Sequence, residues 1–227
     1  FFKEAVDLFM KGDIFYSRRI GKTPTLFYSV EDSLKEGESI SKNPVQQRLV
    51  NATKVSGRNK KGLAIGVLNA VTANTYATLS DAENNQRKVL TDPATNYNLL
   101  VFDQALKNNS NVYITNTNVI RGSNFRDANV TASGITLNDK SNTYRFSLSG
   151  GMSQVFMPAE AENQQSTVRG YKYGISASKT NGNLQWSISR GTLDNKFNAN
   201  DMGLTIYNNY NNNSAAVSYS IYKPFWV

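Results

Sequence analysis

Apolar and polar residues alternate with a period of two in several stretches of the chain. In residues 143–154, Tyr144, Phe146 and Leu148 alternate with Arg145 and Ser147. Successive side chains of a β-strand point to opposite faces, so this pattern predicts a strand with one apolar and one polar face. The same alternation recurs in residues 167–179, 184–191 and 214–223.

The alternation, together with runs of β-branched and aromatic residues between turn-forming residues, predicts an antiparallel meander of about eleven strands. The strands are expected at residues 14–21, 48–57, 62–72, 96–106, 112–120, 126–137, 143–154, 167–179, 184–191, 202–210 and 214–223. The expected connections alternate between long and short along the chain. A soluble sandwich has no reason to keep this parity, whereas outer-membrane barrels have short periplasmic turns and longer external loops.

The predicted fold class is therefore an all-β, antiparallel transmembrane β-barrel. Residues 1–12 are expected to be a periplasmic lead-in or plug segment, and residues 13–227 a portion of the barrel. Bacterial barrels have even strand numbers, so we expect a larger barrel from a chain that is incomplete at both ends, or closure by another chain. Parity places residues 73–95 and 157–166 outside the cell, and residues 58–61 and 180–183 in the periplasm.

Composition removes several kinds of chemistry. The chain contains no Cys and no His, which excludes disulfides and Ser-His-Asp catalysis in this segment. Acidic pairs in the expected external loops lack the spacing of an EF-hand, so no metal and no cofactor is predicted. The net charge of +8 is spread over turns and strands. This distribution suits a cationic lumen or contact with acidic lipid headgroups better than nucleic-acid binding.

Four charged residues near the N-terminus are the candidate site residues. Arg18 and Arg19 are neighbours, so in a strand they would point to opposite faces, one of them into the lumen. Glu4 and Asp7 would share one face of a helix. We expect lumenal or structural ion pairs between these carboxylates and the arginines, with the N-terminal segment plugging the lumen.

The opening residues also carry a resemblance to a known family. Residues 1–21, FFKEAVDLFMKGDIFYSRRIG, and more loosely residues 61–71, KGLAIGVLNAV, resemble the start of the barrel region in Bacteroidota outer-membrane proteins described as carbohydrate-binding family 9-like domain-containing proteins. Lys3 and Ala5 depart from that pattern. The resemblance implies a periplasmic sugar-binding-like domain preceding a barrel of unknown function in the outer membrane.

The expected function is that of an outer-membrane transport or glycan-related uptake component with a polar lumen, and not of an enzyme. Its expected partners are outer-membrane lipid, other outer-membrane proteins, and glycans bound through a domain outside this sequence. One alternative is an accessory or scaffold subunit of a larger outer-membrane complex. Another is a soluble carbohydrate-active β-protein.

Overall fold

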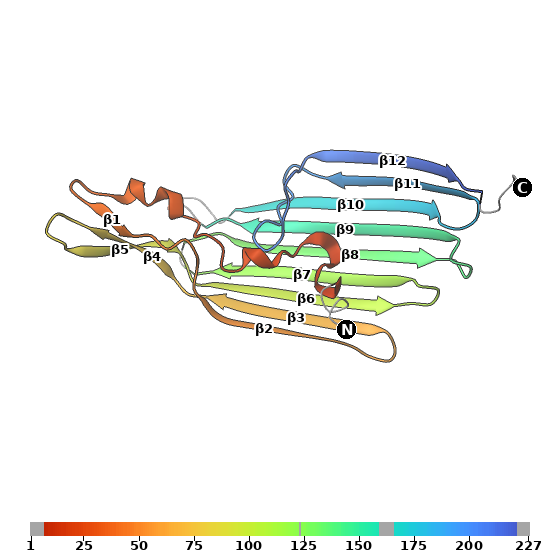
Figure 1. Cartoon of the computed structure of the whole chain (residues 1–227), viewed down its shortest axis with the longest axis horizontal. Coiled ribbons are helices and arrows are strands. Elements are labelled where there is room, and N and C mark those ends of the chain that lie inside the picture. The colour runs from red at the N-terminus through yellow and green to blue at the C-terminus, as the bar shows by residue number, and fades with distance from the viewer. Residues whose placement is uncertain (1–6, 123, 159–165, 222–227) are drawn as a thin grey trace, which may run out of the picture.

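The computed structural model describes residues 7–122, 124–158 and 166–221. The protein is all-β and antiparallel, as predicted, and its strands form two sheets (Figure 1). The larger sheet has nine strands in the order β12-β11-β10-β9-β8-β7-β6-β3-β2, and the smaller has the order β1-β4-β5. The strands are β1 (Ser39–Lys42), β2 (Leu49–Arg58), β3 (Leu63–Thr72), β4 (Thr75–Ser80), β5 (Gln86–Asp92), β6 (Thr95–Ala105), β7 (Asn111–Arg121), β8 (Asp127–Asn138), β9 (Tyr144–Phe156), β10 (Thr167–Lys179), β11 (Leu184–Leu193) and β12 (Tyr210–Tyr219).

The nine-stranded sheet is open, and β2 and β12 form its two edges. The described residues therefore do not form a closed barrel. In an antiparallel sheet with an odd number of strands, the two edge strands run in the same direction. They cannot pair with each other in the antiparallel manner that joins all the other strands.

Short and long connections of the nine-stranded sheet lie at opposite ends, as the alternation predicted. The short turns lie at the right-hand end in Figure 1 and the small sheet projects beyond the other end. The short turns comprise residues 59–62, 106–110, 139–143 and 180–183. At the other end, residues 73–94, 157–166 and 194–209 are long connections, and residues 122–126 form a connection no longer than two of the turns. We call these the short-turn end and the long-loop end.

The first expected strand, at residues 14–21, is not a strand. The region instead contains the 3-10 helices η1 (Lys11–Asp13) and η2 (Ser17–Arg19). Gly12 and Asp13 both have positive φ, which turns the chain out of an extended path. Ile14 and the adjacent Phe15 are both buried, whereas a strand lying on one face of a sheet would bury alternate residues. The packing of these apolar side chains overrides their β propensity.

Three further expectations were wrong. Residues 202–210 were expected to be a strand, yet only Tyr210 belongs to one, and the preceding residues form the long connection before β12. Residues 73–95 were expected to be a loop, yet they contain β4 and β5. Residues 22–47, also read as a loop, contain β1 and the 3-10 helices η3 (Phe27–Ser29) and η4 (Glu31–Ser33).

The small sheet has its own core, in which Val30, Ala77 and Leu79 are buried. An ion pair holds the loop before β1 to β5. Arg87 donates hydrogen bonds from Nε to Glu38 Oε1 (2.7 Å) and from Nη2 to Glu38 Oε2 (2.6 Å). The hydrogen bonds from Arg87 lower the pKa of Glu38 from 4.5 to about 2.

We expect this ion pair to make the stability of the small sheet depend on pH. Because the pKa of Glu38 is depressed, its contribution is fully present above pH 4.5 and is lost as the pH falls through about 2. Carboxyl NMR titration of an Arg87→Met variant should show the Glu38 midpoint returning toward 4.5. A matched Lys88→Met variant, which alters the exposed neighbour on β5, should leave it near 2. An unchanged midpoint in Arg87→Met would contradict the assignment.

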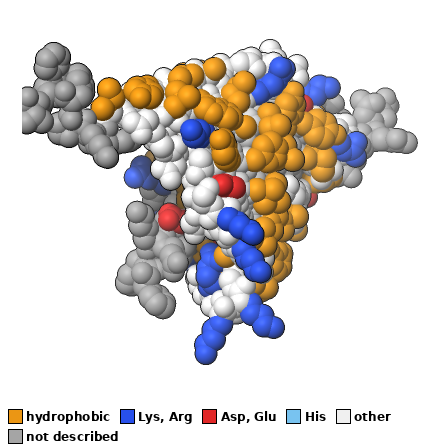
Figure 2. Space-filling view, turned by 90° about the vertical axis from the view of Figure 1, so that its right-hand side faces the viewer, with side chains coloured by type: hydrophobic (Ala, Val, Ile, Leu, Met, Phe, Trp, Pro, Cys, Tyr) orange, Lys and Arg blue, Asp and Glu red, His pale blue; other side chains and the backbone are white. Residues whose placement is uncertain are grey.

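The two faces of the nine-stranded sheet differ. On one face, which we call the covered face, lie residues 7–21, the N-terminal segment, and residues 194–209, the β11–β12 loop (Figure 1). The opposite, outer face carries large apolar side chains that are half exposed. They include Ile65, Val67, Leu100, Phe102, Val112, Ile114, Leu137, Tyr144, Phe146, Leu148, Tyr171, Tyr173, Ile175 and Ile188. Viewed from the short-turn end, hydrophobic side chains gather along one side of the molecule (Figure 2).

Helices contribute little to the fold. Among the described residues, helix is confined to residues 7–9 and to the 3-10 turns η1 to η4, and none has the length or hydrophobicity of a membrane-spanning helix.

Candidate functional site on the covered face

The N-terminal segment and the β11–β12 loop pack against the sheet and against each other. The amide of Tyr16 donates a hydrogen bond to the carbonyl of Met202 (2.7 Å). Phe9 and Phe15 share an apolar cluster with Met202 and with small and branched side chains of β3, β6 and β7. Ile14 packs in a second cluster with Phe197 and Ala199 of the loop. The two segments therefore form one unit that covers part of this face.

Asp201, at the centre of the loop, is held by two arginines from the β7–β8 region. Arg121 Nη2 lies 2.7 Å from Asp201 Oδ1, and Arg126 Nη2 lies 3.1 Å from Asp201 Oδ2. The side chains of Arg121 and Asp201 are 5% and 3% exposed. Arg121 Nη1 also donates to the carbonyl of Arg126 (2.7 Å). A buried charge requires a partner with good geometry, so this ion pair fixes the loop to the sheet.

The predicted site residues separate in the structure. Arg19 donates from Nε to the carbonyl of Gly203 (2.8 Å) and from Nη2 to Asn200 Oδ1 (3.1 Å). Asp7 is exposed, and within the described part of the chain it forms no ion pair with Arg18 or Arg19. Glu4 lies outside the described residues. Arg19 therefore stabilises the covering segments through the β11–β12 loop, and the expected pairing with Asp7 is not observed.

Cations join the covering segments to the sheet in several places. Lys11 Nζ lies 3.5 Å from Asp103 Oδ2, which also pairs with Arg58 at 3.2 Å. Lys54 Nζ lies 4.3 Å from the centre of the Phe9 ring. Lys172 donates a hydrogen bond to the carbonyl of Gly12, and its ammonium lies 5.4 Å from the ring centre of Phe197.

Glycines allow the covering segments to approach the sheet closely. A Cβ atom on Gly170 of β10 would lie 2.2 Å from the backbone nitrogen of Phe197. A Cβ on Gly203 would lie 2.8 Å from the carbonyl oxygen of Ile14. The close contacts of the loop with β10 and with the N-terminal segment therefore require glycine at both positions.

The covered face changes character toward the short-turn end, where small hydroxyl side chains replace the apolar contacts. Thr136 and Ser147 form a hydrogen bond of 3.2 Å, and Ser189 and Ser214 form one of 2.7 Å. Ser176 lies between these pairs in the same cross-strand row. A surface of small hydroxyl groups is compatible with water and with polar solutes.

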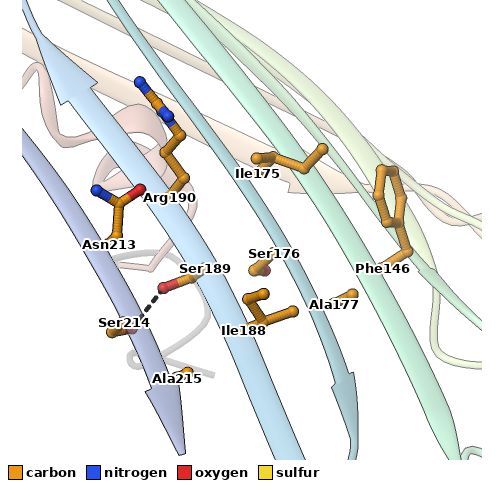
Figure 3. A pocket seen from close by; sticks show the side chains of 10 residues that line it. All are labelled: Phe146, Ile175, Ser176, Ala177, Ile188, Ser189, Arg190, Asn213, Ser214 and Ala215. Atoms are coloured by element: carbon orange, nitrogen blue, oxygen red, sulfur yellow. Dashed lines mark hydrogen bonds between the residues drawn. The ribbon is translucent and has the colours of Figure 1, made fainter.

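On the outer face, the last strands form a shallow apolar depression of about 520 Å³ (Figure 3). Phe146, Ile175 and Ile188 rise beside the small side chains of Ala177 and Ala215. The depression is bordered by Arg190 and Asn213. Its lining suits an apolar chain, and it offers no constellation of groups for catalysis.

The acidic residues of the described part of the chain do not gather into a metal-binding cluster. Within the described ranges, no cluster of three or more His, Cys, Asp or Glu residues is close enough to bind one ion.

Lys22, which follows the N-terminal segment, has its pKa lowered, chiefly by burial and also by the charge of Arg121. The cations near the loop are therefore partly desolvated.

The fold defines an all-β protein whose antiparallel sheet is covered on one face by its own N-terminal segment and one loop. A family model described as Domain of unknown function (DUF5916) matches residues 1–227, and the chain belongs to this family. Comparison with the curated proteins and with the solved structures gives no match.

Sequence reasoning missed the Asp201 ion pairs. Asp201 stands 80 residues from Arg121, and only the fold brings them together. One signal was available, since Asp194 and Asp201 are the acidic residues of an Asn-rich connection. That composition alone could not distinguish a buried ion pair from a solvated loop charge.

Proposed function

We propose that the chain forms the wall of a transmembrane β-barrel in an outer membrane. It would act as a transport component with a polar lumen, and the N-terminal segment with the β11–β12 loop would occlude that lumen. The covered face would line the lumen and the outer face would contact lipid. No catalytic role is assigned to this segment.

The observation that carries the proposal is the outer face. Large apolar side chains occupy successive outward positions of neighbouring strands, with Phe146 40%, Leu148 48% and Ile175 43% exposed. Soluble proteins do not leave contiguous apolar patches of this extent open to water. On the covered face, the residues between these positions are Ser147, Ser176 and their hydroxyl neighbours. Lipid outside and a polar lumen inside account for both faces.

The outward apolar positions do not all lie at one level across the sheet. The residues directly across the sheet from Ile65 of β3 are Phe102, Ile114, Ser133, Gly150, Tyr173 and Thr192.

On β11, however, the outward apolar residues are Ile188, Trp186 and Leu184, which lie toward the short-turn end of Thr192. The displacement is not uniform, because Tyr173 of β10 remains in the row of Ile65.

The resemblance of residues 1–21 to a Bacteroidota family with a carbohydrate-binding family 9-like domain extends the proposal. It favours a glycan-related solute and an outer membrane of that bacterial group. The long connections would then face outward and the short turns would face the periplasm.

Cysteine accessibility tests the assignment of the faces. In the reconstituted protein, a Tyr173→Cys variant should react with lipid-soluble reagents and be shielded from water-soluble ones, because Tyr173 lies on the outer face. A Ser176→Cys variant should behave in the opposite way once the reagent can enter the lumen. Reaction of Tyr173→Cys with water-soluble reagents, with Ser176→Cys shielded, would reverse the faces and exclude this barrel.

The open sheet edges favour a second candidate, an accessory or scaffold subunit of a larger outer-membrane complex. All ten residues of β2 and all ten of β12 are exposed, and unpaired strand edges inside a membrane require partners. Purification of the complex from native membranes distinguishes the candidates. A stoichiometric partner that crosslinks to β2 or β12 would favour the scaffold, and a protein that purifies alone as a closed barrel would favour the transporter.

A further inference from the structure

On the outer face, a row of amide side chains borders the apolar surface on the side of the long-loop end. Asn69, Asn98, Asn118, Asn129 and Gln154 lie directly across from one another on β3, β6, β7, β8 and β9. We call these five residues the amide row. Each of them is half-buried.

Most large apolar outward residues lie on the short-turn side of the row, while Val71, Ile120 and Phe156 lie on its long-loop side. Val67 precedes Asn69 among the outward positions of β3, Leu100 adjoins Asn98 on β6, and Met152 precedes Gln154 on β9. An amide within hydrocarbon loses its hydrogen bonds to water at a cost of several kcal/mol, ~2–7 depending on the reference. If the chain spans a membrane as proposed above, the amide row therefore lies at the level of the lipid headgroups.

Hydrogen bonds within the strands use only part of the capacity of these amides. Asn69 Nδ2 donates to Asn98 Oδ1 (2.8 Å), and Asn129 Nδ2 donates to Asn116 Oδ1 (3.3 Å). Asn118, in the middle of the row, makes no side-chain hydrogen bond to a described residue. A primary amide offers two N–H donors and a carbonyl with two lone pairs, so the row presents unused donors and acceptors outward.

From this placement we infer that the amide row binds the saccharide headgroups of glycolipids in the leaflet on the long-loop side. Sugar hydroxyls both donate and accept hydrogen bonds, as amides do, and they need no charge. The row contains no cation, and Arg169, across from Gln154 at its end, is the cation nearest in register. Phosphate groups would therefore find little positive charge, whereas a neutral hydroxylated headgroup matches the whole row.

The inference rests on the proposed membrane location. The experiment distinguishes failure of the saccharide site from failure of the membrane location. The full chain is reconstituted into phosphatidylcholine vesicles that contain minor fractions of digalactosyldiacylglycerol, an uncharged glycolipid, and phosphatidylglycerol, an anionic lipid. Polymer-bounded discs then extract the protein with its adjacent lipids for mass spectrometry. We expect about fivefold enrichment of the glycolipid over the bulk, the ratio that one net hydrogen bond of ~1 kcal/mol per lipid gives.

A variant with Asn98, Asn118 and Asn129 changed to Val removes the amides and keeps residues that favour strands. Its glycolipid content should fall to about the bulk ratio. The single variant Asn118→Val should lose part of the enrichment. The matched control changes Asn211, Asn212 and Asn213 of β12 to Val, which alters the same residue type away from the row. That control should retain the enrichment.

The outcomes differ for the two proposals. An inserted protein with no glycolipid enrichment, or with enrichment of phosphatidylglycerol instead, would overturn the saccharide site and leave the barrel intact. Enrichment that survives in Asn118→Val and the triple variant would place the binding elsewhere. Failure of the unmodified chain to insert into any vesicle would refute the membrane location, and the site with it.

Discussion

Replacing Leu148 with Arg should destabilise the protein in a membrane by about 2–4 kcal/mol, the cost of a cation at the midplane of a barrel's lipid face. Leu148 lies in the middle of the outward apolar residues of β9, across from Ile135 and Ile175. The measurement is reversible unfolding in urea from phospholipid vesicles. In a soluble protein, a half-exposed Leu→Arg change would cost much less, within about 0.5 kcal/mol at an ordinary surface site.

The control for Leu148→Arg is the adjacent residue. Ser147→Arg introduces the same charge one residue away, but on the covered face, where its cross-strand neighbours are Thr136 and Ser176. It should cost little in the same vesicles, because an arginine there remains hydrated in the lumen. Equal costs for the two variants would remove the distinction between the faces on which the proposed function depends.

Replacing Asp201 with Ala should release the β11–β12 loop and raise the conductance of the barrel in planar bilayers. The change leaves the buried Arg121 without its carboxylate, and breaking a buried ion pair in this way costs about 3–5 kcal/mol. Release of the loop also removes Asn200 and Gly203, to which Arg19 bonds, so the N-terminal segment should loosen as well. Single-channel recording is the measurement, and the unmodified barrel should conduct poorly.

Two variants make the Asp201 result specific. Tyr207→Ala alters the same loop at a side chain that is 80% exposed, and should leave both stability and conductance unchanged. A double variant, Asp201→Leu with Arg121→Met, replaces the buried charges by apolar groups and should recover much of the lost stability. Large stable pores in the unmodified protein would show that the loop does not occlude the lumen. If Asp201→Ala displaces the loop but the protein still shows no conductance, the result would favour the scaffold.

Strand positions in the large sheet followed closely from the sequence. The stretch 167–179 was predicted from the alternation of Tyr171, Tyr173 and Ile175, and β10 has those bounds. Period two is a local property, and it survives because each strand has two unlike faces. The division of short and long connections between the two ends of the sheet was also predicted, since it follows from the order of the strands alone.

Other parts of the fold depend on contacts between distant residues, which the sequence pattern does not contain. Residues 14–16 have the composition of a strand, but they pack on the covered face in a non-extended conformation. Ile14 and Phe15 enter two different apolar clusters there. Tyr76 and Leu79 of β4 stand in a polar region, so the small sheet was not predicted. Arg19 bonds to a carbonyl and an amide of the β11–β12 loop, and these partners could not be read from nearby carboxylates.

The covering segments have a kinetic consequence. Arg19 bonds to a residue 184 positions later in the chain, and Gly12 to one 160 positions later. The N-terminal segment therefore acquires these contacts only after β10 and the β11–β12 loop have been synthesised. Contacts of such large sequence separation form slowly because a long loop must close first. Until then the N-terminal segment lacks its native partners. The topology therefore imposes a delay between the synthesis of this segment and its packing against the sheet.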